Sequence, residues 1–249
     1  MLSKAQIKLI KSLHNQKFRN ETGLFIAEGK KLVEDIAASD IEIAYTYATS
    51  RYNGDIPHID ITEDELDKIS ALSAPQGILA LCKIPSNKSS LPDISNSLTL
   101  ALDDIRDPGN LGTIVRIADW FGINYIFCSQ ESVDIYNPKA VQATMGSIAH
   151  VEVIYVDLKE VLQKYSKASI PIYGAMLTGD NIYEQKLKPN GIIVIGNEAN
   201  GISEPVARCV TNTIGIPSYA TGKGPESLNA AVATAVICAE FRRKTNAHS

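Results

Sequence analysis

The sequence has none of the features that mark secreted, metal-binding or membrane-spanning proteins. Its four cysteines are widely spaced and form no CxxC pair, so we expect reduced, half-buried thiols rather than a disulfide framework. The four histidines form no ligand-like pair with each other or with a cysteine, which argues against a zinc site. The longest apolar runs, such as 230–239, are too short to cross a bilayer, and no secretory signal follows Met1. We therefore expect a cytoplasmic protein without a metal or a membrane partner.

Three common catalytic signatures are also missing. No GxGxxG motif joins a strand to a helix, which argues against a nicotinamide enzyme. The segment Thr221–Gly224 vaguely suggests a phosphate loop, but Lys223 is followed by glycine, so the Walker spacing is absent. Ser227 lacks the flanking glycines of a nucleophile elbow, which argues against nucleophilic hydrolysis.

The chain does have an ordinary globular composition with an uneven distribution of charge. Hydrophobic residues make up 45% of it and charged residues 21%, and the formal net charge of −4 argues against a protein coated in nucleic acid. The first thirty-one residues are nevertheless basic, and Lys4, Lys8 and Lys11 recur at the spacing of one helix face. Such a stripe is suited to contact phosphates, although a solvated helix face is the more ordinary explanation.

A polar stretch bracketed by two prolines divides the chain into two predicted α/β domains. This stretch, Pro85–Pro92, is typical of a linker. We expect domains at 1–84 and 98–249, joined by a linker at 85–97. Within the first domain we expect helices at about 3–13, 28–38 and 63–71, and strands at 24–26, 41–48 and 77–82.

The second half alternates more regularly between strand-like and helix-like segments. Short, nearly all-apolar runs rich in Ile, Val and Tyr are typical of parallel strands that are buried on both faces. We expect such strands at 98–102, 125–128, 151–156, 170–174, 192–195 and 213–216. Helices are expected at 111–121, 138–149, 158–166, 203–209 and 228–243. The alternation predicts a parallel sheet covered by helices, with ligands bound at the carboxyl ends of its strands.

The loop after the first of these strands, Asp103–Arg116, is the first of three loops with unusual composition. Asp107-Pro108-Gly109 predicts a turn, and Asn110 stands where a helix N-cap belongs. Arg116 follows on the same helix. A simple cap and an ordinary surface arginine are the alternatives to functional roles for these two residues.

The two other loops follow later strands of the predicted sheet. In Ile195–Ser203, Gly196 lies two residues before Glu198 and Gly201 three residues after it, which suggests a backbone that closely approaches a ligand. Glu198 is equally suited to start a helix as an acidic residue. The third loop runs from Ile216 to Asn229 and leads into the last helix.

Together, and in this order, the three loops resemble the signature motifs of the SpoU/TrmH family of RNA methyltransferases in the SPOUT superfamily. The match covers about 98–243, and the motifs are Asp107–Gly112 with Arg116, Ile195–Glu198 with Gly201, and Ile216-Pro217 with Ser227–Ala233. The chain departs from the family between Pro217 and Ser227, where its loop is longer than usual. The first half is similar to the L30e-like RNA-binding domain often found in this family, through 23–29 and 74–80.

The resemblance implies a fold and a cofactor. It implies a C-terminal α/β domain with a deep trefoil knot, which composition and periodicity do not reveal, and a smaller L30e-like α/β domain before it. The cofactor would be S-adenosylmethionine, bound in the knot, and family members are homodimers. The positions implied for cofactor binding are Gly174, Leu177, Ile195, Gly196, Asn197, Ile216, Pro217, Ser227 and Leu228.

The resemblance also implies transfer of a methyl group to a ribose 2′-hydroxyl of RNA. Arg116 would be a fixed cation beside the emerging alkoxide, because an arginine does not normally lose its proton. Asn110 and Glu198 would orient it, and Ser227 and Asn229 would hydrogen-bond the ribose, a phosphate or the first loop. Positions implied for RNA binding are Lys8, Lys11, Lys17, Arg19, Glu28 and Gly29.

Several alternatives stay open at this stage. Ribosomal RNA, with a guanosine of the 23S type favoured, is expected over transfer RNA because a domain precedes the knot. A non-catalytic RNA-binding knot protein is a second possibility, although the set of five polar motif residues argues against it. A methyltransferase for a small molecule or a protein is a third, which the basic N-terminal region makes less attractive.

Overall fold

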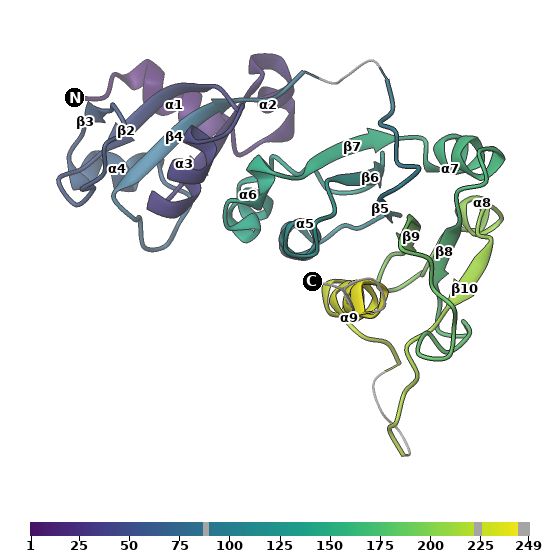
Figure 1. Cartoon of the computed structure of the whole chain (residues 1–249). Helices are drawn as coiled ribbons and strands as arrows, with labels where there is room; N and C mark the ends of the chain where they lie inside the picture. The colour runs from purple at the N-terminus through teal and green to yellow at the C-terminus, as the bar shows by residue number, and fades with distance from the viewer. Residues whose placement is uncertain (87–89, 222–225, 244–249) are drawn as a thin grey trace. The chain divides into compact units, whose positions relative to one another are not determined.

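The computed structural model describes residues 1–86, 90–221 and 226–243, which fall into two compact units (Figure 1). Unit 1 combines the N-terminal residues up to 87 with 134–150, and unit 2 contains 88–133 together with everything after 150. The segment 134–150 lies within the expected range 98–249 of the second domain, but it packs with unit 1. A tertiary contact of this kind leaves no local sign in the sequence.

Unit 1 is built on a four-stranded mixed sheet in the order β1-β4-β2-β3. Strand β4 runs antiparallel to both β1 and β2, and β3 pairs parallel with β2. In chain order the elements are α1 (Lys4–Ser12), α2 (Gln16–Thr22), β1 (Leu24–Glu28), α3 (Lys30–Ala37), β2 (Ile43–Ala48), β3 (Ile59–Asp60), α4 (Glu63–Ile69) and β4 (Ile78–Lys83). The sequence analysis missed α2 and β3, which are too short to show a period.

Local signals explain where the helices of unit 1 begin. Ser3 caps α1 and Thr62 caps α4, and each forms a reciprocal capping box with the residue three positions later. Asn15 caps α2, which ends at Gly23 in the left-handed conformation (φ 66°). The apolar faces of α1 and α4 pack with Tyr47 and its neighbours in one buried cluster.

The added segment of unit 1 contains α6 (Pro138–Thr144) and a short 3₁₀ turn at Ser147–Ala149. A single helix at 138–149 was expected, and this was wrong. Met145 (φ 52°) and Gly146 (φ 101°) are both left-handed, so the helix ends there. A side chain on Gly146 would collide with Asp35, which shows how closely this turn approaches α3.

Unit 2 contains the predicted parallel sheet. Its six strands lie in the order β10-β8-β9-β5-β6-β7, and every neighbouring pair is parallel. In chain order the elements are β5 (Leu98–Leu102), α5 (Pro108–Trp120), β6 (Tyr125–Ser129), β7 (Glu152–Val156), α7 (Leu158–Lys167), β8 (Ile172–Ala175), β9 (Gly191–Ile195), α8 (Glu204–Ala207), β10 (Asn212–Ile214) and α9 (Ala230–Arg243). The predicted fold class is therefore confirmed, while the trefoil knot stays a prediction.

Helices cover both faces of this sheet (Figure 1). On one face, α7 and α8 pack against alternate strand residues such as Ile172, Ile192 and Val194. On the other face, α5 packs with α9, and Phe241 of α9 meets Tyr173 edge to face with ring centroids 4.9 Å apart. Strands buried on both faces explain why their sequences read as continuous apolar runs.

All four cysteines are buried and unpaired rather than half-buried as expected. Burial raises the pKa of the Cys82 and Cys238 thiols to about 12, and it also raises the pKa of Cys128 and Cys209. Because the thiolate is the reactive form, we expect iodoacetamide at pH 8 to leave the native protein unmodified and to label all four residues after unfolding. Mass spectrometry measures this, and rapid labelling of the native chain would contradict the burial.

No helix in the described ranges is both long and apolar enough to span a bilayer.

Candidate active site

Side chains from all three motif loops meet in one hydrogen-bond chain in unit 2. The Asn229 side-chain amide, before α9, donates to Asn110 Oδ1 on α5 over 2.9 Å. Asn110 Nδ2 in turn donates to Glu198 Oε1, after β9, over 2.5 Å. Asn229 and Asn110 are 119 positions apart in the sequence, and Asn110 and Glu198 are 88 positions apart. The structure thus brings together three of the five predicted catalytic residues.

The start of α5 explains why Asn110 is available for these bonds. Asp107, rather than Asn110, is the N-cap, and its carboxylate accepts from the backbone N–H of Asn110 over 2.7 Å. Pro108 then occupies the first helical turn, where its missing N–H costs nothing. The expected N-cap position of Asn110 was therefore wrong. Its side chain is free to link the other two loops.

Asn229 has two roles at once. Its Oδ1 accepts from the backbone N–H groups of Ala231 and Val232 and so caps α9, while its Nδ2 donates to Asn110. Among the roles considered for Asn229, the structure shows the contact with the first loop. The fixed cap holds this amide at the position from which it reaches Asn110.

The glycines of the second loop serve the loop itself. Asn197 and Gly201 exchange two backbone hydrogen bonds of 3.0 and 2.9 Å, which close a tight hairpin around Glu198. A side chain on Gly196 would collide with the backbone of Gly201 and Ile202, and Gly201 has a φ of 66°. Close backbone packing within the loop thus accounts for both glycines. Glu198 lies in this turn and not at the start of α8.

Two aspartates at the end of β5 hold the second loop against the first, and the sequence analysis gave them no role. Asp103 is buried and accepts from the backbone N–H of Ser203 over 2.7 Å, and the backbone carbonyl of Asp104 accepts from Asn197 Nδ2 over 2.8 Å. Asp104 adopts a left-handed φ of 58°, which is uncommon outside glycine. Two consecutive acids at a strand end were the available signal.

A cavity of about 640 Å³ opens beside this hydrogen-bond chain. Its volume is within the usual range for small-molecule and cofactor sites. Its lining includes Glu198 and eight of the nine predicted cofactor positions, namely Leu177, Ile195, Gly196, Asn197, Ile216, Pro217, Ser227 and Leu228. The ninth, Gly174, is absent from the lining, and a side chain there would collide with Val210. The cavity lies at the carboxyl ends of β8, β9 and β10, where ligands bind in such sheets.

Arg116 lies apart from the hydrogen-bond chain. It follows Asn110 by six residues, which on an α-helix is about 9 Å along the axis and about 120° around it. Its side chain is exposed and makes no hydrogen bond or ion pair with any residue in the described ranges. The structure therefore presents Arg116 to solvent on α5 and does not bring it to Glu198 within one chain.

The predicted RNA-binding residues of unit 1 divide into two groups. Lys8, Lys11 and Lys17 are exposed, as contact with RNA requires. Arg19 is only 1% exposed, and its guanidinium binds the Asp134 carboxylate and the Leu13 carbonyl. The structure therefore gives Arg19 a structural role, and its burial argues against the predicted contact with RNA.

Glu28 and Gly29 also have structural explanations. The Glu28 carboxylate is buried and accepts from the Ser70 hydroxyl and from the backbone N–H of Ala71 over 2.8 Å. Gly29 has a φ of 97°, and a side chain there would collide with Gln76. Both residues hold the chain between β1 and α3 in place, and their assignment to RNA contact stays a prediction that the burial of Glu28 does not support.

Among the described residues, no group of three or more His, Cys, Asp or Glu side chains is arranged to hold a metal ion.

In unit 2, hydrogen bonds link three loops beside a cavity at the carboxyl edge of a parallel sheet. This arrangement is that of an α/β protein that binds its ligand at the carboxyl ends of the strands. Residues 97–239 match the model of the SpoU rRNA Methylase family, and residues 4–80 match the MRM3-like substrate binding domain. The chain belongs to the SpoU rRNA methylase family. The predicted family is thereby confirmed.

Several individual proteins are similar to the chain over nearly its whole length. It is 27% identical to the 23S rRNA (guanosine(2553)-2′-O)-methyltransferase RlmP of Bacillus subtilis, over 95% of this chain and 96% of that one. A solved RNA methyltransferase of the TrmH family from Porphyromonas gingivalis is 36% identical, with a TM-score of 0.86 over 98% of this chain and 99% of that one. An AdoMet-bound rRNA methyltransferase from Sinorhizobium meliloti is 28% identical, with a TM-score of 0.84 over 98% and 97%.

Proposed function

We propose that this protein transfers a methyl group from S-adenosylmethionine to a ribose 2′-hydroxyl of ribosomal RNA, with a guanosine of the 23S type as the favoured target. The observation that carries this proposal is the chain of hydrogen bonds from Asn229 through Asn110 to Glu198 beside the cavity. An RNA-binding protein without activity does not require such convergence of three loops. The similarity to a 2′-O-methyltransferase of 23S rRNA supports the choice of atom and of RNA.

The cofactor, S-adenosylmethionine, is confirmed at the level of the family, because a relative of the same family was solved with AdoMet bound. The cavity fits such a group in volume and in lining, which combines apolar residues with Gly196, Asn197 and Ser227. When bound, the cofactor supplies a methyl group on a positively charged sulfur, which is an excellent leaving group. The protein then needs to hold the ribose hydroxyl and stabilise the charge on its oxygen.

Arg116 is our candidate for that charge stabilisation. Its exposure on α5, with no partner in the described ranges, leaves its guanidinium free for a substrate oxygen or phosphate. We propose that the protein works as a homodimer and that the site is completed near the subunit interface. An arginine that is exposed and makes no contact with Asn110 or Glu198 in its own chain is consistent with that arrangement.

Unit 1 is proposed to select the RNA. Its match to a substrate-binding domain and the exposed lysines at positions 8, 11 and 17 support this role. Ordinary lysine–phosphate attraction would supply affinity without sequence preference. We propose a cytoplasmic location, which the reduced cysteines support.

A methyl-transfer assay tests the proposed function. We expect purified protein to move labelled methyl groups from S-adenosylmethionine to ribosomal RNA that lacks the modification, and mapping should place the product at a ribose 2′-oxygen. Deletion of the gene should remove the same 2′-O-methyl mark from cellular RNA. Methyl transfer only to a base would refute the proposed target atom, and transfer only to transfer RNA would refute the proposed substrate. Absence of transfer to any RNA would refute the proposed chemistry.

A further inference from the structure

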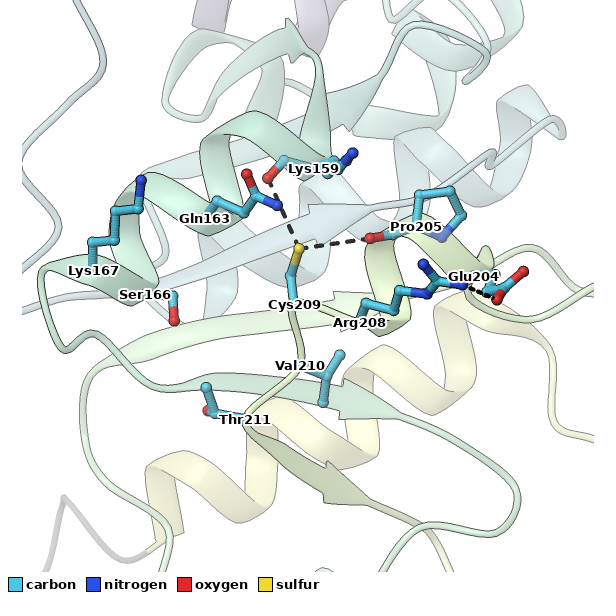
Figure 2. Close-up of a pocket in the computed structure, with 10 residues that line it drawn as sticks. All are labelled: Lys159, Gln163, Ser166, Lys167, Glu204, Pro205, Arg208, Cys209, Val210 and Thr211. Carbon is cyan, nitrogen blue, oxygen red and sulfur yellow. Dashed lines mark hydrogen bonds and ion pairs between the residues drawn. The ribbon is translucent and has the colours of Figure 1, made fainter.

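A second cavity of unit 2, of about 750 Å³, lies between α7 and α8 (Figure 2). Residues Lys159, Gln163, Ser166 and Lys167 line one side, at the spacing that places them on one face of α7. Glu204, Pro205 and Arg208 line the side of α8, and Cys209 to Thr211 lie between. Neither the three motif loops nor the proposed chemistry uses this cavity.

The cavity is predominantly basic in a chain that is acidic overall. Three cations and a single carboxylate line it, whereas the whole chain has a formal net charge of −4. The carboxylate, Glu204, is paired with Arg208 across one turn over 2.5 Å. Lys159 and Lys167 have no ion pair among the described residues. The lining therefore presents positive charge that its own acidic group neutralises only in part.

The floor of the cavity adds no negative charge. Cys209 Sγ lies 3.6 Å from the Pro205 carbonyl oxygen and 3.9 Å from the Lys159 carbonyl oxygen, and so joins the two sides (Figure 2). Burial raises the pKa of the Cys209 thiol, which is therefore neutral at physiological pH. Gln163 and Ser166 contribute an amide and a hydroxyl that are able to donate hydrogen bonds.

The linings of the two cavities adjoin along the chain. Ala199 to Ile202 line the first cavity, and Glu204 and Pro205 line the second. Only Ser203 separates the two linings along the chain, and its backbone N–H is held by Asp103.

We infer that the cavity between α7 and α8 binds the phosphate backbone of the RNA substrate. This inference rests on the proposed function and adds an RNA contact on unit 2 to the one proposed for unit 1. Lys159, Lys167 and Arg208 supply the charge, and Gln163 supplies a neutral donor. Contacts of this kind fix the register of the strand without reading its sequence.

Charge removal at the cavity tests the inference. The triple variant Lys159→Gln, Lys167→Gln, Arg208→Gln is compared with Lys164→Gln, Lys186→Gln, Lys188→Gln, which removes as many exposed positive charges from unit 2 but none from either cavity lining. For each lost phosphate contact, the slope of log K for an unmodified rRNA fragment against log[salt] should fall by about 1 in magnitude. We expect RNA affinity at least about tenfold weaker than in the control, unchanged kcat at saturating RNA and unchanged affinity for S-adenosylmethionine.

A second variant has an effect of the opposite sign, which misfolding does not mimic. Glu204→Gln removes the only carboxylate of the cavity lining and releases Arg208 from its ion pair. We expect this variant to bind the RNA fragment more tightly than the wild type, by a few-fold at low salt. An unchanged or weaker affinity for RNA would contradict the inference.

Binding is measured separately from catalysis, so the two proposals fail in distinguishable ways. A wild-type protein that binds RNA but transfers no methyl group refutes the proposed function alone. A triple variant that matches the control in affinity and salt slope, while the wild type is active, refutes the cavity contact alone. A titration of the protein with pyrophosphate tests the alternative that the cavity binds a small free anion instead of RNA. Pyrophosphate binding that the triple variant loses, without any change in RNA affinity, would identify a small-anion site and overturn the inference.

Discussion

Replacement of Arg116 by alanine should reduce methyl transfer to RNA by about 10²- to 10³-fold in kcat, the effect of removing one donor that stabilises a developing negative charge. Arg116 does not line the first cavity, so the affinity for S-adenosylmethionine should be unchanged. The exposed position of Arg116 on α5 also means that its removal should cost little stability. Single-turnover transfer to unmodified rRNA and equilibrium binding of the cofactor measure the two quantities.

Two further variants define the role of this guanidinium. Arg116→Lys should also fail, because an ammonium does not reproduce the planar fork of donors. Arg51→Ala is the matched control, since Arg51 is an exposed arginine paired with Glu63 in unit 1, and it should retain the wild-type kcat. If Arg116→Ala kept near-normal kcat, the assignment would be wrong. A weaker affinity for RNA with unchanged kcat would reduce its role to phosphate binding.

Much of unit 2 was predictable because its strands are buried on both faces. The strands Leu98–Leu102 and Gly191–Ile195 are buried at every position, and their ends fall within one residue of the predicted limits. The three loops were recognisable because turn and polar residues follow directly after such runs. The lining of the first cavity then contained the predicted positions, with Gly174 as the exception.

The errors share a physical cause, which is that a polar residue shows its partner only in three dimensions. Asn110 was expected to cap a helix because it follows a turn, yet Asp107 takes that role and Asn110 bonds side chains about a hundred residues away. Arg19 was read as part of a basic surface, although it is among the most buried side chains. Asp134, its partner, is 115 residues distant in sequence. No local pattern records such a pair.

The Arg19–Asp134 pair carries the second large effect that we expect, on stability. Arg19→Ala should lower the free energy of unfolding by about 3–5 kcal/mol, because it leaves a carboxylate that is largely buried without its countercharge. The side chains of Arg19 and Asp134 are only 2% and 11% exposed. Denaturant unfolding measures the loss. The control is Lys17→Ala, which breaks an exposed pair with Glu21 and should cost less than about 1 kcal/mol.

A double-mutant cycle distinguishes a structural role for Arg19 from RNA binding. If Arg19 serves only to hold 134–150 on unit 1, Asp134→Ala should destabilise the protein to a similar extent, and the apolar pair Arg19→Met, Asp134→Leu should recover much of the stability. This apolar variant should bind RNA as tightly as the wild type and with the same salt dependence, because neither charge is accessible to a phosphate. If the apolar variant were stable but bound RNA more weakly, Arg19 would be shown to contribute to RNA binding. Equal affinity would leave the exposed lysines of α1 and α2 as the basic groups of the N-terminal segment that are available to RNA.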